Sequence, residues 1–240
     1  MKGRAVKLCL TAVALGVAVA FALATPSVGS PASAPVTTFP AAGTLEISGV
    51  RVRAEPDPEA TVLRLIHYFR SDYRVQEILA VGSRVGSNGQ LWYRISVPGR
   101  PNGRLGWIPA WSVSLKPTVA KVVVHRHTRR IDLYWYGKHV WRGKVAVGAP
   151  GMETPIGLFY ATARFVPHDD PYLTTYAVET SGYSKLTEWP GGGVFGIHGT
   201  PDPSSLGKAA SHGCVRVSAQ TALKLRRYVP LGTPIFITRT

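Results

Sequence analysis

The chain has 240 residues, of which 45% are hydrophobic, and it carries a formal net charge of +15 with only two cysteines. This length and apolar content allow one or two packed domains, and the cysteine count excludes a disulfide-rich scaffold. The excess of Lys and Arg indicates anionic partners, but no nucleic-acid recognition motif accompanies it, so we expect no binding to nucleic acid.

Residues 1–24 have the organisation of a secretory signal peptide. A basic start precedes an apolar run at 8–23, and Ala22, Leu23 and Ala24 form a small-residue cleavage site. A membrane-spanning helix needs about 20 apolar residues, so an uncleaved anchor is the less favoured alternative. We therefore expect export across the cytoplasmic membrane to the cell wall or periplasm, where a basic protein meets anionic wall polymers.

The two cysteines are Cys9 and Cys214. Cys9 lies inside the apolar run and leaves with the signal peptide, so the mature chain has no internal disulfide. A lone thiol in an oxidising compartment is a hazard unless it is used. We therefore expect Cys214 to be functional, and pairing between two chains is the alternative.

Residues 25–43 are rich in Pro, Ala, Ser and Thr, which predicts a linker. Beyond it, from 44 to 117, short apolar segments alternate with turn residues. Strands are expected at 47–53, 75–81, 91–97 and 106–109, with a hairpin-like turn at 86–89. Many short strands with regular turns predict a small β-barrel.

Three motifs in this barrel resemble those of bacterial SH3-like domains. They are Val52-Arg53-Ala54-Glu55-Pro56, Gly89-Gln90-Leu91-Trp92-Tyr93-Arg94-Ile95 and Gly106-Trp107-Ile108. The resemblance implies an SH3-like domain over 44–117 that binds wall peptide or glycan. For Trp92 and Trp107 themselves, a place in the core is the favoured role. The segment 65–74 is longer and bulkier than the loop expected there.

Residues 118–240 are predicted to form a second, mainly β domain with one helix. Strands are expected at 121–124, 130–136, 139–147, 158–163 and 232–238, with a turn-rich loop at 148–157. The helix is expected at 219–228, because Ser218 is a favourable N-cap and Ala222, Leu225 and Val229 share one face.

Two segments of this second domain leave alternatives open. Residues 165–193 show little periodicity, which is typical of a functional lid or binding rim; the alternative is an ordered excursion without ligand contact. Arg126, Arg129 and Arg130 lie in the predicted turn at 125–130. They form either a solvated basic tip, which is favoured, or a specific binding site.

Chemistry is expected at Cys214, which follows His198 by sixteen residues and His212 by two. A free thiol with a pKa of about 8.5 is mostly protonated at neutral pH, and a neighbouring imidazolium lowers that pKa. The thiolate is a nucleophile for acyl transfer, and the backbone N–H groups of 212–214 could receive the developing oxyanion. His212 would share a face with Cys214 on an extended segment, whereas the fold must bring His198 close. The residues alone do not choose between the two bases.

A zinc site is the competing interpretation of His198, His212 and Cys214. The usual Cys-x-x-Cys and His-Glu-x-x-His spacings are absent, and Asp202 lies in a Pro-rich turn. A purely structural His–Cys pair is equally disfavoured. We therefore expect no metal.

The segments His198-Gly199-Thr200 and Ser211-His212-Gly213-Cys214-Val215-Arg216-Val217 together resemble the catalytic domain of L,D-transpeptidases (YkuD-type). The loop Thr154-Pro155-Ile156-Gly157 matches the same family. The resemblance spans about 119–238. It implies a mainly β, sandwich-like catalytic domain over 118–240 with one main helix after the cysteine.

The resemblance also implies roles for single residues. Cys214 is the nucleophile, His198 its base, and the carbonyl of Gly199 orients the His198 imidazole, while His212 lines the site. Arg216 holds a substrate carboxylate or braces the loop. The other implied substrate-binding residues are Ser211, Gly213 and Thr200.

The implied reaction is acyl transfer on peptidoglycan stem peptides without a cofactor. The thiolate of Cys214 attacks the carbonyl that joins the third stem residue to a terminal D-alanine, and a thioester forms. The amine of a second stem then completes a 3→3 cross-link. Carbapenems resemble the donor and should acylate the same sulfur. The alternatives are an L,D-carboxypeptidase, in which water is the acceptor, and a non-catalytic wall-binding protein.

Overall fold

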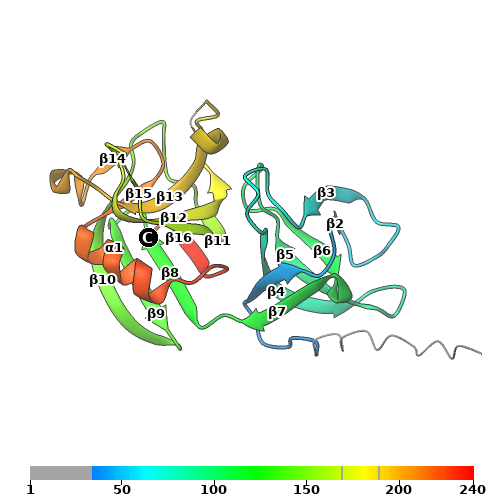
Figure 1. Cartoon of the computed structure of the whole chain (residues 1–240). Helices are drawn as coiled ribbons and strands as arrows, with labels where there is room; N and C mark the ends of the chain where they lie inside the picture. The colour runs from blue at the N-terminus through cyan, green and yellow to red at the C-terminus, as the bar shows by residue number, and fades with distance from the viewer. Residues whose placement is uncertain (1–33, 169, 189) are drawn as a thin grey trace, which may run out of the picture. The chain divides into compact units, whose positions relative to one another are not determined.

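The computed structural model describes residues 34–168, 170–188 and 190–240. The predicted signal peptide at 1–24, Cys9 and the predicted linker up to residue 33 lie outside these residues. Across the described ranges, no helix has both the length and the apolar character needed to cross a membrane. The structure is mainly β and contains two sheets (Figure 1).

The first sheet has seven strands in the order β3-β2-β6-β5-β4-β1-β7, all antiparallel to their neighbours. Its core consists of inward-facing residues such as Val52, Ile78, Ile95 and Ile108. The strands are β1 (Ala41–Leu45), β2 (Gly49–Arg53), β3 (Val62–His67), β4 (Glu77–Val85), β5 (Leu91–Ser96), β6 (Leu105–Pro109) and β7 (Val113–Pro117), with a 3₁₀ turn at Ala110–Ser112.

This sheet confirms four predicted strands as β2, β4, β5 and β6, and it buries Trp92 and Trp107 in or beside the core. It differs from expectation at two places. Strand β1 begins at Ala41, inside the predicted linker. The bulky segment predicted as a loop at 65–74 begins within β3. Because β3 is an edge strand with Val62 and Leu65 exposed, it lacks the alternation that marks a half-buried strand.

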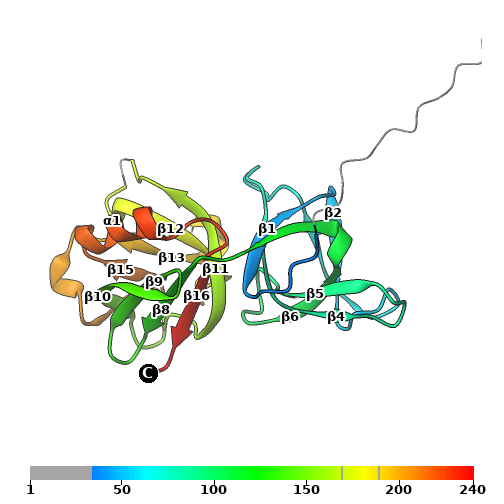
Figure 2. The same ribbon diagram turned by 90° about the horizontal axis from the view of Figure 1, so that it is seen from below.

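The second sheet has nine strands in the order β14-β10-β15-β13-β12-β11-β16-β8-β9, and β10 also pairs with β9 (Figure 2). That extra pairing closes the sheet on itself. The strands are β8 (Ala120–His125), β9 (Arg130–Trp135), β10 (Lys138–Gly148), β11 (Gly157–Phe165), β12 (Thr174–Tyr183), β13 (Val194–Gly199), β14 (Ala209–Ser211), β15 (Val215–Val217) and β16 (Pro234–Thr238), with 3₁₀ turns at Pro190–Gly193 and Pro203–Ser205.

The predicted helix is confirmed as α1 (Ala219–Tyr228), which packs on β12 and, to a lesser extent, on β9, β10 and β13. Its N-cap is Ser218, whose Oγ accepts a hydrogen bond from Thr221 N at 3.2 Å; such a cap stabilises a helix by about 1 kcal/mol. Ala222 and Leu225 are fully buried against the sheet, and Val229 follows them.

Strand β12 corrects the interpretation of 165–193 as a segment without regular structure. It runs for ten residues through the middle of that segment, between β11 and β13. Most of its residues are buried, and they lie on both faces of the strand. The period-two pattern of a half-buried strand is therefore missing. Only the stretches on either side of β12 are irregular.

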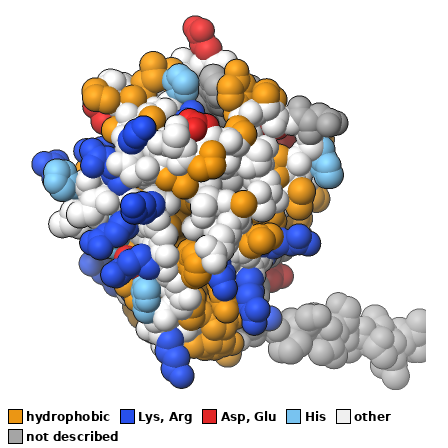
Figure 3. All heavy atoms as spheres, turned by 90° about the vertical axis from the view of Figure 1, so that its left-hand side faces the viewer, with side chains coloured by type: hydrophobic (Ala, Val, Ile, Leu, Met, Phe, Trp, Pro, Cys, Tyr) orange, Lys and Arg blue, Asp and Glu red, His pale blue; other side chains and the backbone are white. Residues whose placement is uncertain are grey.

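Basic side chains gather on the face that carries α1, where Lys and Arg outnumber Asp and Glu (Figure 3). In the predicted turn between β8 and β9, Arg130 is exposed, whereas Arg126 and Arg129 are half-buried. Arg126 Nη1 donates to the carbonyl of Thr154 at 3.1 Å and Arg129 Nη1 to that of His127 at 3.3 Å. Two of the three arginines are therefore anchored.

Candidate active site

Strand pairing brings the two distant parts of the candidate site together. Strands β13 and β15 are adjacent and parallel, with His198 in register with Arg216 and Ile197 in register with Val215. Cys214 directly precedes β15, so it lies two positions from Arg216, the strand partner of His198. The sequence separation of sixteen residues is bridged in this way.

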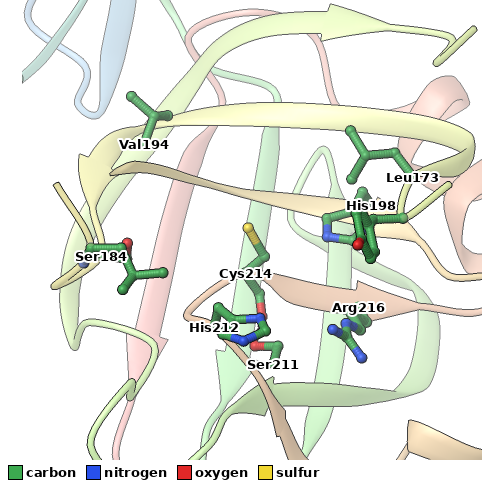
Figure 4. A pocket seen from close by; sticks show the side chains of 10 residues that line it. Leu173, Ser184, Val194, His198, Ser211, His212, Cys214 and Arg216 are labelled. Atoms are coloured by element: carbon green, nitrogen blue, oxygen red, sulfur yellow. Dashed lines mark hydrogen bonds between the residues drawn. The ribbon is translucent and has the colours of Figure 1, made fainter. Parts of the chain in front are cut away.

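Cys214, His198 and His212 line one pocket of about 230 Å³. Figure 4 shows the Cys214 sulfur directed into this pocket, with the His198 ring on one side and Ser184 across from it. Cys214 is the free cysteine of the described residues. The other residues that line the pocket are Tyr172, Leu173, Leu186, Val194, Ser211 and Arg216.

A tight bend between β14 and β15 presents Cys214. Ser211 Oγ donates to the Cys214 carbonyl at 2.5 Å and accepts from Gly213 N at 3.2 Å, so one buried hydroxyl holds both ends of the bend. Gly213 has φ +118°, and a Cβ there would lie 2.7 Å from Ser184 Cβ. Only glycine fits that conformation and that approach.

This bend corrects one expectation. The segment 212–214 is a bend and is not extended, so His212 and Cys214 do not share a strand face; His212 is exposed at the rim of the pocket. The N–H of Gly213 donates to Ser211 Oγ, and an oxyanion site at the N–H groups of 212–214 stays a prediction. Gly196 N directs its hydrogen at Cys214 Sγ over 3.5 Å.

His198 is buried, and its Nδ1 lies 2.8 Å from the Gly199 carbonyl oxygen. A carbonyl only accepts, so Nδ1 carries the proton and Nε2 keeps its lone pair. Gly199 has no room for a side chain, because a Cβ there would lie 2.2 Å from the carbonyl oxygen of Thr174 on β12. The hydrogen bond to the Gly199 carbonyl fixes the tautomer and the orientation of the imidazole, and the close approach of β12 and β13 requires glycine at 199.

Burial disfavours the charged forms of both partners. It lowers the pKa of His198, although the Gly199 carbonyl acts in the opposite direction, and the charge of Arg216 lowers it further. Burial raises the pKa of Cys214, against smaller opposing effects of the Gly196 N–H and Arg216. Desolvation thus opposes the charged forms of both groups in the ligand-free site, and the thiolate–imidazolium pair stays a prediction.

The remaining predicted site residues divide into two groups. Arg216 lines the pocket, and within the described residues it makes no ion pair with a carboxylate, so its charge is available to a ligand. Thr200 is buried beside the pocket, and its Oγ1 accepts from Asp202 N at 3.2 Å. Ser211 and Gly213 shape the bend. Thr200, Ser211 and Gly213 thus organise the backbone around the pocket.

Part of the pocket wall was not predicted residue by residue. Tyr172 and Leu173 precede β12, Ser184 and Leu186 follow it, and Val194 begins β13. All of them except Val194 fall in the segment interpreted as a lid or rim, which was the available signal. The described residues contain no cluster of three or more His, Cys, Asp or Glu side chains able to hold a metal ion.

The loop at 148–157, before β11, contacts the bend that carries Cys214. Thr154 is fully buried and its Oγ1 accepts from Gly148 N at 2.9 Å. In the same loop, Ala149 N donates to the carbonyl of Ser211 at 2.8 Å. The predicted turn-rich loop at 148–157 is confirmed, and its contacts connect it to Cys214 through Ser211.

Residues 120–237 match the family model of the L,D-transpeptidase catalytic domain, YkuD. The YkuD protein of Bacillus licheniformis is 33% identical over 118 residues, which cover 49% of this chain and 65% of that protein. YqjB of Bacillus subtilis is 28% identical over 141 residues, covering 54% of this chain and 78% of that protein. This chain thus spans a little less than two thirds of the Bacillus licheniformis protein.

One solved structure that is similar to this chain is an L,D-transpeptidase from Mycobacterium smegmatis, with 19% identity and a TM-score of 0.42. The match covers 62% of this chain and 90% of that chain. The catalytic domain of the Enterococcus faecium L,D-transpeptidase has 23% identity and a TM-score of 0.37, covering 50% of this chain and 96% of that one. The family match and the curated relatives thus show that residues 120–237 are similar to the catalytic domain of YkuD-type L,D-transpeptidases.

Proposed function

We propose that this chain is a peptidoglycan L,D-transpeptidase that forms 3→3 cross-links through a thioester on Cys214. The observation that carries the proposal is the shared pocket: a lone thiol and a buried imidazole with a fixed tautomer line it together. His198 is the better base of the two histidines, because its Nδ1 is occupied by the Gly199 carbonyl and its Nε2 lone pair remains for the thiol.

In the first half-reaction, the thiol of Cys214 gives its proton to His198 Nε2 as sulfur attacks the carbonyl of the third stem residue. A sulfur–carbon bond forms, the carbon–nitrogen bond to D-alanine breaks, and the proton passes from His198 to the leaving amine. Because burial disfavours the charged form of each group, the proposed proton transfer accompanies the attack of sulfur on the carbonyl.

In the second half-reaction, the side-chain amine of a diamino acid on another stem attacks the thioester. The new amide bond forms, the sulfur–carbon bond breaks, and sulfur regains a proton through His198. Arg216 is the proposed partner of a donor carboxylate, since it lines the pocket without an ion pair in the described residues. His212 contributes to the rim.

Two alternative activities use the same chain. With water as acceptor, the same thioester would make the protein an L,D-carboxypeptidase. A non-catalytic wall-binding protein would keep the fold without turnover. Incubation with a disaccharide-tetrapeptide separates the three: a cross-linked dimer supports the transpeptidase, a tripeptide alone supports the carboxypeptidase, and unchanged substrate supports the wall-binding protein.

The rest of the chain has a proposed place in this function. The signal peptide would direct the protein across the cytoplasmic membrane to the cell wall or periplasm, and the first sheet would act as an SH3-like module for wall peptide or glycan. The net charge of +15 and the basic face in Figure 3 support contacts with anionic wall polymers.

The deciding experiment is mass spectrometry of the intact protein after incubation with a carbapenem. We expect the protein mass to increase by that of one carbapenem, and Cys214→Ala to abolish the increase. His198→Ala should lose nearly all acylation, whereas His212→Ala should lose less. No adduct on the native protein contradicts the proposed chemistry, and a larger loss in His212→Ala contradicts the assignment of the base.

A further inference from the structure

Arg100, in the loop between β5 and β6, reaches the stretch of chain that forms one wall of the catalytic pocket. Its guanidinium donates to the carbonyls of Ser184 at 2.9 Å, Leu186 at 3.0 Å and Gly192 at 2.9 Å. It also lies over the ring of Tyr183, with Cζ 4.6 Å from the centroid. Three carbonyls from one short segment thus converge on a single side chain of the first sheet.

Asn102, two residues further along the same loop, pairs with the end of β12. Its Nδ2 donates to the Tyr183 carbonyl at 2.7 Å, and its Oδ1 accepts from Tyr183 N at 2.9 Å. Gly99 N donates to the Ser181 carbonyl at 3.2 Å. The side-chain amide of Asn102 therefore makes the pair of hydrogen bonds that the backbone of a neighbouring strand would make, at the residue where β12 ends and the pocket wall begins.

The segment held in this way contacts the catalytic bend. Ser184 and Leu186 line the pocket, and Ser184 faces the Cys214 sulfur from the opposite side (Figure 4). A Cβ on Gly213 would lie 2.7 Å from Ser184 Cβ, so Ser184 packs against the residue directly before Cys214. A shift of Ser184 would change both the shape of the pocket and the support of the bend.

The loop 97–104 is itself braced from its own sheet. Arg64 on β3 donates through Nη2 to the Arg100 carbonyl at 3.2 Å, and a Cβ on Gly99 would meet the Arg64 guanidinium. On the other side, Gly193 leaves no room for a side chain, because a Cβ there would lie 1.6 Å from the Leu186 carbonyl and 2.9 Å from Arg100 Nη2. The loop 97–104 is therefore held by Arg64, and the absence of a side chain at Gly193 leaves space for the Arg100 guanidinium.

We propose that Arg100 is a positioning residue for the active site: by binding the carbonyls of Ser184, Leu186 and Gly192, it holds the pocket wall opposite Cys214. The first sheet then completes the site in addition to any contact with the wall. This inference rests on the proposed function for its kinetic readout. Its structural readout is independent, because amide exchange reports the wall whether or not Cys214 reacts.

The test compares wild type, Arg100→Ala and Arg104→Ala in the full chain. Arg104 is the matched control, because it lies in the same loop and its side chain makes no hydrogen bond or ion pair with the described residues. Stopped-flow acylation by a carbapenem gives the binding constant and the maximal rate separately, and hydrogen–deuterium exchange follows residues 184–193. Thermal unfolding checks that each variant is folded.

We expect Arg100→Ala to lower the second-order acylation constant by about tenfold or more, mainly through weaker binding, because hydrogen bonds to a charged donor are lost. Amides at 184–193 should exchange faster, while Arg104→Ala matches wild type. Wild-type rates and exchange in Arg100→Ala would overturn the inference. If Arg100→Ala does not fold, Arg100→Lys serves in its place. Lysine has fewer donors in the required directions, so the second-order acylation constant should fall by less than tenfold. An unreactive wild type refutes the proposed function alone.

Discussion

Removing the hydroxyl of Ser211 tests whether the bend that carries the nucleophile is held by that one group. In Ser211→Ala, the Cys214 carbonyl loses its donor at 2.5 Å and the Gly213 N–H loses its acceptor at 3.2 Å. Ser211 is 2% exposed and Gly213 is buried, so solvent replaces these bonds poorly. The bend should become both less stable and less well placed.

The magnitude follows from the two groups left without partners. A buried polar group that loses its hydrogen bond costs about 1–3 kcal/mol. The Cys214 side of the bend faces the pocket, where water can enter, so the combined loss in the free energy of unfolding should be about 2–4 kcal/mol. A displacement of the nucleophile by about 1 Å slows a reaction by up to about a hundredfold, so acylation should slow by at least tenfold.

Urea denaturation of both proteins gives the free energy of unfolding, and stopped-flow mixing with a carbapenem gives the acylation rate. Ser87→Ala is the matched control, because Ser87 is exposed in the β4–β5 turn and its hydroxyl bonds to Asp57. That control should change stability by less than about 0.5 kcal/mol. If Ser211→Ala behaves like Ser87→Ala in both assays, the hydroxyl does not hold the bend and the reasoning is refuted.

Three further predictions concern titration and packing. Burial lowers the pKa of His198 from 6.5 and raises that of Cys214 from 9.0, so the free energy of unfolding should fall as pH drops below 6.5 or rises above 9.0. The loss of the free energy of unfolding below pH 6.5 should be smaller in His198→Gln than in wild type, and the loss above pH 9.0 should be smaller in Cys214→Ser. Losses equal to those of wild type would contradict this prediction. Burial raises the pKa of Glu77 from 4.5 to about 7, so its stabilising protonated form is lost as pH rises through that value. After allowance for its partial exposure, Glu77→Gln should raise the free energy of unfolding by about 1–2 kcal/mol at pH 8 and by little at pH 4, and a pH-independent effect argues against the assignment. Gly199→Ala would place a Cβ 2.2 Å from the Thr174 carbonyl oxygen and should cost about 1–3 kcal/mol of stability with a loss of acylation; unchanged thermal unfolding would show that β12 and β13 can separate.

Local patterns were enough to predict several elements and to single out Cys214 and His198, which line the same pocket. Helix α1 and its Ser218 cap follow from side-chain chemistry within one turn, and β2 follows from alternation within a few residues. The lone Cys214 and the glycines beside both histidines pointed to nucleophilic chemistry. These features depend on residues close together in the chain, so they can be read without the fold.

Tertiary structure decided what depends on distant partners. Strand β12 is buried on both faces by neighbours that no local period reveals, and its ends supply Ser184 and Leu186 to the pocket. The shifts in the pKa values of Cys214 and His198 come from desolvation, which exists only once the sheet has closed around them. The contact of Arg100 with the pocket wall joins residues more than eighty positions apart. Burial and long-range contact are properties of the packed chain, so spacing in the sequence could indicate the reacting groups without specifying their protonation or the wall that faces them.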